Sequence, residues 1–381
     1  MKKYVTLGEI CTKGSSSIAQ KDIEQNNGIY GIYGASGYIK DVDFYHQEKP
    51  YIAIVKDGAG IGRTMLLPEK TSVIGTMQYL IPKETVCVYY LYYAVTYMNL
   101  AKYFTGATIP HIYFKDYQKE KLPLPSIEEQ RIIADNLRRA DRLIELCCAI
   151  LDKLDLLVKS RFVEMFGDTE VNSNNYPIHK LSDLCTVSSS KRIYQEEQSS
   201  SGVPFLRISN LVELIDNDKF GSELFIPEEK YNELLENGLV PKPDDILVTS
   251  RGTLGKCYII QKHDKFYFQD GMISWLYDID KSITPLYLTL LFDTRNIKRQ
   301  IENLQSGSTV AYLSIAMLKK LNIVVPPLAL QEQFADFVEH TDKSKFYTGK
   351  IRKIIRSVKN NEQLCVFTDK TCLSAFCTGD C

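Results

Sequence analysis

The segment NGIYGIYG, Asn27–Gly34, contains GIY twice, and one class of nuclease carries a GIY motif followed by a YIG motif. Such a nuclease also needs an arginine and a glutamate placed to attack the substrate and to hold a metal ion. Downstream the sequence reads GASGYIKD, so Tyr38, Ile39 and Lys40 stand where YIG is required. The motif is incomplete, and we interpret its glycines as positions where a strand turns or the backbone approaches a neighbour closely.

Other sets of catalytic residues are incomplete as well. The chain has no GxxxxGK[ST] phosphate-binding loop, which argues against ATP hydrolysis by this chain. It has no Asn-Pro-Pro-Tyr-like segment of an amino-methyltransferase, and Pro243-Asp244 lacks the acidic residue and lysine of a metal-dependent nuclease. The five histidines stand at no metal-ligand spacing from one another. We therefore predict no catalytic residues and no bound cofactor in this chain.

Four cysteines gather at the C-terminal end, at Cys365, Cys372, Cys377 and Cys381. Four thiols could hold zinc, but their spacing is irregular and lacks the usual C-x2-C pair. We interpret this segment as a frayed end, or as the result of an altered reading frame, and predict no metal. The remaining cysteines are scattered, which favours a reducing compartment over a disulfide framework.

The composition is that of a folded, multidomain protein. A chain of 381 residues exceeds the roughly 250 at which single cores stop growing, and its 44% apolar and 24% charged residues are typical of globular proteins. The formal net charge of -1 gives no chain-wide attraction to nucleic acid, so such a site would be local. The start has no apolar run of a signal peptide, and Val86–Leu100 is too short to span a bilayer. We expect a soluble, cytoplasmic protein without membrane contact.

The sequence repeats itself once. Four segments recur in the same order with small insertions between them, which indicates two diverged copies of one unit. The pairs are Leu7–Thr12 with Leu181–Thr186, Ile54–Arg63 with Leu247–Lys256, Thr105–Pro110 with Ser306–Ala311, and PLPSIEEQ ending at Gln130 with PPLALQEQ ending at Gln333. Each copy starts with short β-type segments, continues with an apolar helix (89–104 or 285–304) and ends in a long helix after a proline-rich break.

The long helices carry heptad patterns. If helical from Glu128 to Phe162, the first would be roughly 50 Å long at ~1.5 Å per residue. Two such helices can bury their apolar stripes against each other, although each could also pack on its own domain. The first pattern comprises Ile133, Leu137, Ala140, Ile144, Cys147, Leu151, Leu154 and Val158. The second, with a polar middle, comprises Phe337, Thr341, Ser344, Thr348, Ile351, Ile355 and Val358.

Two glycine-rich turns place cations beside small and hydroxyl residues. Lys56–Arg63 reads KDGAGIGR and Thr249–Lys256 reads TSRGTLGK, each with a cation directly after its last glycine. Backbone NH groups, hydroxyls, lysine and arginine bind phosphate oxygens, and arginine also reads base edges. The turns are also consistent with ordinary hairpins. Their duplication favours a two-part DNA target, because two major-groove half-sites one turn apart lie ~34 Å from each other.

The chain resembles the specificity subunit of type I restriction-modification systems. The resemblance rests on IVKDGAGIGRTMLLPEKTSVIGTMQYL, TGATIPHIYFKDY, PLPSIEEQRIIA and PPLALQEQFADFVEHTDKSK, and covers the chain to about Asn360. It implies an α+β fold: two similar α/β target recognition domains, two long antiparallel coiled-coil helices and a pseudo-twofold internal repeat. We assign the recognition domains to 1–122 and 168–325, the spacer helices to 123–167 and 326–360, and a cysteine-rich tail to 361–381.

The resemblance also implies the partners. Each recognition domain would read one half of a split sequence in double-stranded DNA, and the helices would dock two methyltransferase subunits that carry S-adenosylmethionine. A motor subunit with ATP, magnesium and nuclease activity would complete the complex. This sequence departs from the family after Lys345, where Gly349 and the cysteine-rich end replace a helix rich in Leu, Glu and Lys.

We therefore predict a non-catalytic DNA-recognition subunit. A self-contained endonuclease and an assembly scaffold without DNA binding are the alternatives. Arg251 is the first choice for reading a base, because it lies at the tip of a glycine-flanked turn. The predicted DNA-contacting residues are Lys56, Arg63, Thr108, Arg192, Arg207, Arg251, Thr253, Lys256 and Thr309.

Overall fold

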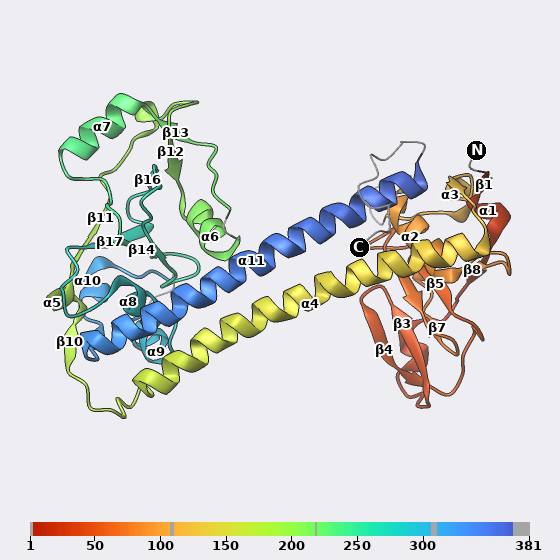
Figure 1. Ribbon diagram of the computed structural model, residues 1–381, viewed down its shortest axis with the longest axis horizontal. Coiled ribbons are helices and arrows are strands. Elements are labelled where there is room, and N and C mark those ends of the chain that lie inside the picture. The colour runs from red at the N-terminus through yellow and green to blue at the C-terminus, as the bar shows by residue number, and fades with distance from the viewer. Residues whose placement is uncertain (1–2, 107–109, 218, 306–310, 369–381) are drawn as a thin grey trace, which may run out of the picture. The chain divides into compact units, whose positions relative to one another are not determined.

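The structure is a computed structural model that describes residues 3–106, 110–217, 219–305 and 311–368. The chain divides into two compact units, one formed by Met1–Leu151 with Phe346–Cys381 and the other by Asp152–Lys345. Below they are called unit 1 and unit 2. Each unit contains part of both long helices, α4 (Ile127–Phe166) and α11 (Leu328–Phe367), which Figure 1 labels.

Unit 1 is built on a four-stranded antiparallel sheet and a smaller, three-stranded sheet. The four-stranded order is β2 (Cys11–Ser15), β8 (Met77–Pro82), β5 (Tyr51–Val55), β6 (Thr64–Leu67). In the smaller sheet, β3 (Tyr30–Gly34) pairs antiparallel with β4 (Gly37–Val42) and parallel with β7 (Ser72–Val73). A third pairing joins β1 (Tyr4–Thr6) to β9 (Lys121–Pro123). The short helices are α1 (Leu7–Ile10), η1 (Gln20–Ile23), α2 (Val88–Tyr97), η2 (Leu100–Tyr103) and α3 (Phe114–Tyr117).

Unit 2 repeats this plan strand by strand. The four-stranded order is β11 (Thr186–Ser189), β17 (Ile273–Tyr277), β14 (Ile246–Thr249), β15 (Cys257–Ile259). In the smaller sheet, β12 (Val203–Leu206) pairs antiparallel with β13 (Phe225–Ile226) and parallel with β16 (Tyr267–Phe268). β10 (Ile178–Lys180) pairs with β18 (Asn322–Val324). The helices are α5 (Leu181–Leu184), η3 (Gln195–Glu197), α6 (Ile208–Asn217), α7 (Glu228–Glu236), α8 (Pro285–Phe292), α9 (Arg295–Leu304) and α10 (Ile315–Lys319).

The sequence explains why β5 and β14 lie inside their sheets. Both strands are apolar runs whose residues are all buried, YIAIV and ILVT. Alternate side chains of a strand point to opposite faces, so Ile52 and Ile54 enter one core with α2, and Ala53 enters the core on the other face. Each unit therefore has its own two-sided core, and the predicted α+β fold with two similar domains is confirmed. In the described part of the chain, no helix combines the length and the apolar character needed to cross a membrane.

A buried glutamine fastens the start of each long helix. Gln130 accepts a hydrogen bond from the Cys87 backbone NH at 2.9 Å and donates to the Thr85 and Pro125 carbonyls. Gln331 makes the same three bonds, accepting from Thr284 and donating to the Ser282 and Pro326 carbonyls. Gln130 thus corresponds to Gln331, and the sequence pairing of Gln130 with Gln333 is wrong by two residues.

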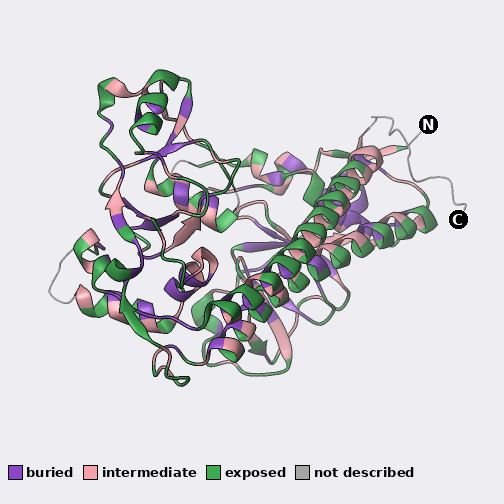
Figure 2. Cartoon of the chain, turned by 60° about the vertical axis from the view of Figure 1, so that its left-hand side comes forward, coloured by how far each residue is buried: buried purple, intermediate pink, exposed green. Residues whose placement is uncertain are grey.

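The two long helices are antiparallel within each unit. In unit 1, Asn136 Nδ2 donates to Glu362 at 3.4 Å, and Asp141 pairs with Lys359. In unit 2, Asp155 pairs with Lys345 at 2.7 Å and the Phe162 ring meets the Phe334 ring edge-on at 5.7 Å. Residue numbers rise along α4 as their partners fall along α11, which confirms the predicted antiparallel pair. Figure 2 shows the exposed outer faces of both helices in green.

The heptad positions on α4 and α11 differ in chemistry. All eight positions predicted for α4 are buried or half-buried. On α11, Phe337 and Ile355 are half-buried, but Ile351 and Val358 are 52% and 41% exposed, so their placement in the pattern is wrong. The inward positions there belong to Lys345, Arg352 and Lys359, whose charged ends reach Asp155, Cys148 and Asp141 of α4. Long cationic side chains can bury their methylene stems and still pair their charge, which apolar periodicity does not register.

The end of α11 is ordered further than the sequence suggested. The helix passes Gly349 and residue 360, where the second spacer helix was predicted to end, and ends at Phe367. Phe367 is buried beside Tyr90 and Tyr97, with ring centroids 5.5 Å and 5.7 Å away. Phe166 ends α4 against Tyr287 in unit 2 in the same way, at 4.8 Å. An aromatic anchor therefore closes each helix. Cys372, Cys377 and Cys381 lie outside the described residues.

Replacing Phe367 with alanine should destabilise unit 1. Truncating a buried phenylalanine typically costs about 3–5 kcal/mol, and here the anchor of a helix end would be lost. Phe346→Ala is the matched control, because Phe346 lies on the same helix and is 66% exposed. We expect F367A to lower the thermal midpoint and to speed hydrogen exchange in the last turns of α11, with F346A close to wild type. Equal behaviour of the two variants would contradict the anchor.

Candidate nucleic-acid interface

The glycine-rich turn of unit 1 is held by four backbone hydrogen bonds. Val55 NH donates to the Arg63 carbonyl at 2.9 Å, and Gly62 NH donates back to Val55 at 2.8 Å, which closes the turn between β5 and β6. Two further bonds tie Lys56 to neighbouring segments: its NH donates to the Thr76 carbonyl at 3.0 Å, and its carbonyl accepts from Ile112 NH at 2.9 Å. The turn is therefore set against the segment that contains Ile112.

Unit 2 reproduces these four bonds. Thr249 NH donates to the Lys256 carbonyl and Gly255 NH donates to Thr249, both at 2.9 Å. Ser250 NH donates to Met272, and the Ser250 carbonyl accepts from Leu313 NH, again at 2.9 Å. The four bonds thus match the two ends of the turns, but the turn of unit 1 is one residue longer, with six residues between Val55 and Gly62 against five between Thr249 and Gly255.

This matching defines equivalent positions that carry different side chains. We call the two sets the reading loops: residues 55–63 with Thr76, His111 and Ile112 in unit 1, and residues 249–256 with Met272, Tyr312 and Leu313 in unit 2. The position of Asp57, bridged to His111, is held in unit 2 by Arg251, bridged to Tyr312. One frame therefore presents two different surfaces.

Positive-φ glycines give the loops their shape. Gly62 has φ +78°, and a Cβ there would lie 2.4 Å from the Ala101 backbone nitrogen on η2. Gly58 has φ +83° but open space where its Cβ would lie. Gly62 thus allows the loop to pack directly against the η2 backbone, whereas Gly58 is required only for the left-handed conformation of the turn.

Arg251 is an exposed cation without a carboxylate partner among the described residues. Its Nη1 lies 3.8 Å from Met272 Sδ, and its backbone bridges Tyr312. Thr253 is exposed on the same turn, where its carbonyl accepts a bond from the Thr249 hydroxyl. Arg251 is therefore free to donate to a ligand.

Two other predicted cations of unit 2 already have partners. Arg192 Nε donates to Asp270 Oδ2 at 2.9 Å, and this hydrogen bond raises the pKa of Arg192 above its ordinary value. Lys256 forms an ion pair with Asp216 on α6. Because a carboxylate already offsets each of these positive charges, both cations should attract a phosphate less than the sequence suggests. Residue spacing in the sequence did not reveal the partners Asp216 and Asp270.

The segment 269–272 has contacts at or next to three arginines of unit 2. Gln269 NH donates to the Leu206 carbonyl, next to the exposed Arg207, at 2.9 Å. Asp270 holds Arg192, and the next two residues lead to the Met272 carbonyl, which binds the Arg251 turn through Ser250. The segment 269–272 thus contacts Arg192 through a side chain, and the residues next to Arg207 and Arg251 through its backbone.

Unit 1 has a different set of side chains at its loop. Lys56 Nζ lies 3.7 Å from Asp57 Oδ2, and His111 Nδ1 donates to Asp57 Oδ1 at 2.7 Å. The exposed Arg63 donates from Nη1 to the Ala35 carbonyl at 3.1 Å. Asp57 and His111 are far apart along the chain and were not among the predicted DNA-contacting residues. Thr108 and Thr309 lie outside the described residues.

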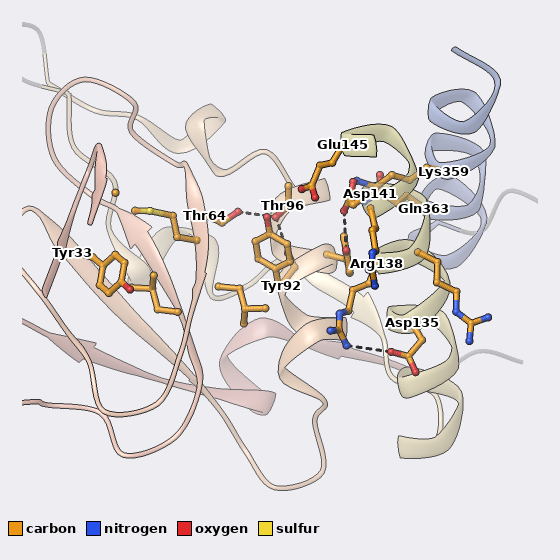
Figure 3. A pocket seen from close by; sticks show the side chains of 17 residues that line it. Tyr33, Thr64, Tyr92, Thr96, Asp135, Arg138, Asp141, Glu145, Lys359 and Gln363 are labelled. Carbon is orange, nitrogen blue, oxygen red and sulfur yellow. Dashed lines mark hydrogen bonds and ion pairs between the residues drawn. The ribbon is translucent and has the colours of Figure 1, made fainter. Parts of the chain in front are cut away.

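A separate groove of about 1020 Å³ lies in unit 1 among β6, α2, α4 and α11 (Figure 3). Asp141 accepts a hydrogen bond from the Tyr93 hydroxyl at 2.8 Å and pairs with Lys359. Burial, and then this hydrogen bond, raise the pKa of Tyr93 well above its ordinary value. Arginines and carboxylates alternate along α4 here, with Arg138 3.4 Å from Asp135. Because its charges are of mixed sign, the groove suits a protein surface better than a phosphate backbone.

Comparison with known proteins identifies the family. The model described as "Type I restriction modification DNA specificity domain" matches residues 2–156 and 174–356. The chain belongs to this family. With two copies of the domain, it is a sequence-specificity subunit of the type I restriction-modification class.

Named relatives agree with this assignment. A type I restriction enzyme specificity subunit of Haemophilus influenzae is 24% identical over 84% of this chain and 83% of its own length. The MjaVIII specificity subunit of Methanocaldococcus jannaschii is 25% identical over 84% of this chain and 78% of its own length. The crystal structure of the S subunit from M. genitalium shares the fold, with a TM-score of 0.64 and 16% identity over 97% of both chains. A structure from a study of type I complex assembly gives a TM-score of 0.55 and 14% identity over 96% of this chain and 97% of its own.

The two glycines of the first reading loop should respond differently to alanine. Gly58→Ala adds only the strain of a left-handed residue, roughly 1–2 kcal/mol. Gly62→Ala adds the same strain and also a collision with the Ala101 backbone, so its loss of stability should be clearly larger. Thermal unfolding of the two variants beside wild type measures the difference. A G62A variant as stable as G58A would show that the loop does not rest on η2.

Proposed function

We propose that the chain reads a split sequence in double-stranded DNA, one half with each unit, and directs methyltransferase subunits to that target. The observation that carries the proposal is the pair of reading loops, which share their backbone hydrogen bonds and differ in their side chains. Matching backbone hydrogen bonds with different side chains are what two different half-sequences require, because backbone contacts position a protein on DNA and side chains specify bases.

The exposed arginines of unit 2 support DNA as the ligand. Arg207 and Arg251 are exposed without carboxylate partners among the described residues, and Arg192 shares its charge with Asp270. Arginine donates both to phosphate oxygens and, in a fork, to guanine. The overall charge of -1 means that attraction to DNA depends on such local surfaces.

The long helices support docking of partner proteins. In unit 1, Leu143, Leu146 and Ile150 of α4 are about half exposed and follow one another at helical spacing. Ile351 and Ile354 of α11 are 52% and 54% exposed. Apolar side chains grouped on an open surface are typical of protein contacts. We assign these faces to methyltransferase subunits, which would carry S-adenosylmethionine, with ATP and magnesium in a motor subunit.

Catalysis is accordingly assigned to the partner subunits. No group of three or more possible metal-binding side chains occurs within the described ranges 3–106, 110–217, 219–305 and 311–368. The purified chain with magnesium should leave plasmid DNA uncut. Sustained cutting by the chain alone would instead favour an endonuclease.

Reversing the charge of Arg251 should weaken DNA binding by the assembled complex. Arg251→Glu removes a donor and adds repulsion from phosphates, so we expect at least a tenfold loss of affinity. Lys262→Glu is the matched control, because Lys262 is an exposed cation of unit 2 outside the reading loop. Titration of labelled target DNA at several salt concentrations measures both affinity and salt dependence. Unchanged binding by R251E would favour a scaffold that does not contact DNA.

Polar substitution on the exposed face of α4 should release the methyltransferase. Leu146→Glu combined with Ile150→Glu places two charges where an apolar partner surface would pack, and both positions are about half exposed, so the fold should persist. Co-purification of tagged chain with its methyltransferase subunit tests this. Lys153→Glu, at an exposed position of the same helix, changes the net charge by the same amount and controls for charge alone. A double variant that still binds its partner would place docking elsewhere.

A further inference from the structure

The reading loops carry opposite charges at one equivalent position. Asp57 and Arg251 both follow the residue whose NH and carbonyl bind the neighbouring segments, Lys56 in unit 1 and Ser250 in unit 2. Each then bridges its partner across the loop, His111 or Tyr312. Equivalent backbone hydrogen bonds and an equivalent bridge therefore hold this position in both units, while its side chain differs.

Asp57 is held as a hydrogen-bond acceptor. His111 Nδ1 donates to Oδ1 at 2.7 Å, while Oδ2 lies 3.7 Å from Lys56 Nζ. The carboxylate keeps 29% of its surface exposed between these two groups. A carboxylate has about four acceptor sites, so one firm hydrogen bond leaves acceptor capacity at the loop surface.

The pair of Asp57 and His111 is not needed to close the loop. Backbone bonds already do so: Thr105 and His111 exchange two at 2.8 Å, and Gly58 NH donates to Pro110 at 3.0 Å. Nor does a carboxylate suit a phosphate contact, because both are anions. The Asp57 carboxylate can therefore serve as a hydrogen-bond acceptor for a ligand, and Lys56 beside it reduces repulsion from the DNA backbone.

Arg251 has the complementary property. Its guanidinium is exposed, contacts only the weak acceptor Met272 Sδ among the described residues, and offers several NH donors in a planar fork. In the major groove, guanine presents two acceptors, O6 and N7, that match this fork. Cytosine presents the N4 amino donor, which aspartate accepts.

From these opposed chemistries we infer that Asp57 reads a cytosine in one half of the target and Arg251 reads a guanine in the other half. This inference rests on the proposed function, since it requires that each unit face one half-sequence. The loop of unit 1 would then select its base by accepting a hydrogen bond from it, and the loop of unit 2 by donating hydrogen bonds to it.

The test compares target sequences methylated by the assembled complex. The chain is co-expressed with its methyltransferase subunit, and modified-base sequencing of the host DNA reports the motif for wild type, Asp57→Asn and Arg251→Lys. Asparagine prefers adenine, so D57N should change one cytosine to adenine in one half only. Lysine keeps the charge and loses the planar fork, so R251K should relax one guanine in the other half, by roughly tenfold or more.

Matched variants control for charge and for folding. Asp41→Asn and Arg295→Lys make the same substitutions at exposed positions outside the reading loops and should leave the motif unchanged. Thermal midpoints of all four variants show whether the chains remain folded. A folded D57N whose motif keeps every cytosine, or a folded R251K that selects every guanine as strictly as wild type, would overturn the inference and leave the proposed function standing. A wild-type complex that methylates no split motif would overturn the proposed function, and the inference with it.

Discussion

Burial of the stripe on α4 is the constraint on which the rest of the structure depends. A 40-residue helix has inward positions every three or four residues, and one small domain cannot bury all of them. In unit 1 the stripe is covered by the C-terminal part of α11, and in unit 2 by its N-terminal part, in both cases antiparallel. Each unit therefore needs helical segments from distant parts of the sequence, and its core is complete only when both helices are present.

The two ends of each helix are secured by different physical means. A buried glutamine completes the backbone hydrogen bonds at the start, and a buried phenylalanine fills an aromatic pocket at the end. Buried polar groups must be satisfied, so Gln130 and Gln331 impose one register on the junction between domain and helix. The same junction in both units supports the comparison of their reading loops.

Much of this could be predicted from the sequence, for identifiable reasons. Repeated motifs in constant order reveal a duplicated unit, and the period of the apolar residues reveals the long helix α4. The period of apolar residues could not reveal the inner face of α11, because Lys345, Arg352 and Lys359 occupy it. These cations can face inward because they pair with side chains of α4. The glycine-rich turns were likewise visible, whereas the Asp57–His111 pair joins residues whose proximity only the folded sheet creates. Arg192 and Lys256 were chosen for their charge, and the structure adds carboxylate partners that spacing could not show.

The central claim is that equivalent loops of the two units each face one half of a split target. Photo-crosslinking measures this directly: a photoreactive residue replaces Ala59 in one chain and Thr253 in another, both positions being exposed on the reading loops. Each variant is assembled with its methyltransferase subunits on target DNA, and the crosslinked bases are mapped. The account predicts crosslinks from position 59 in one half of the target and from position 253 in the other half. Crosslinks from both positions in the same half, or from neither, would contradict it.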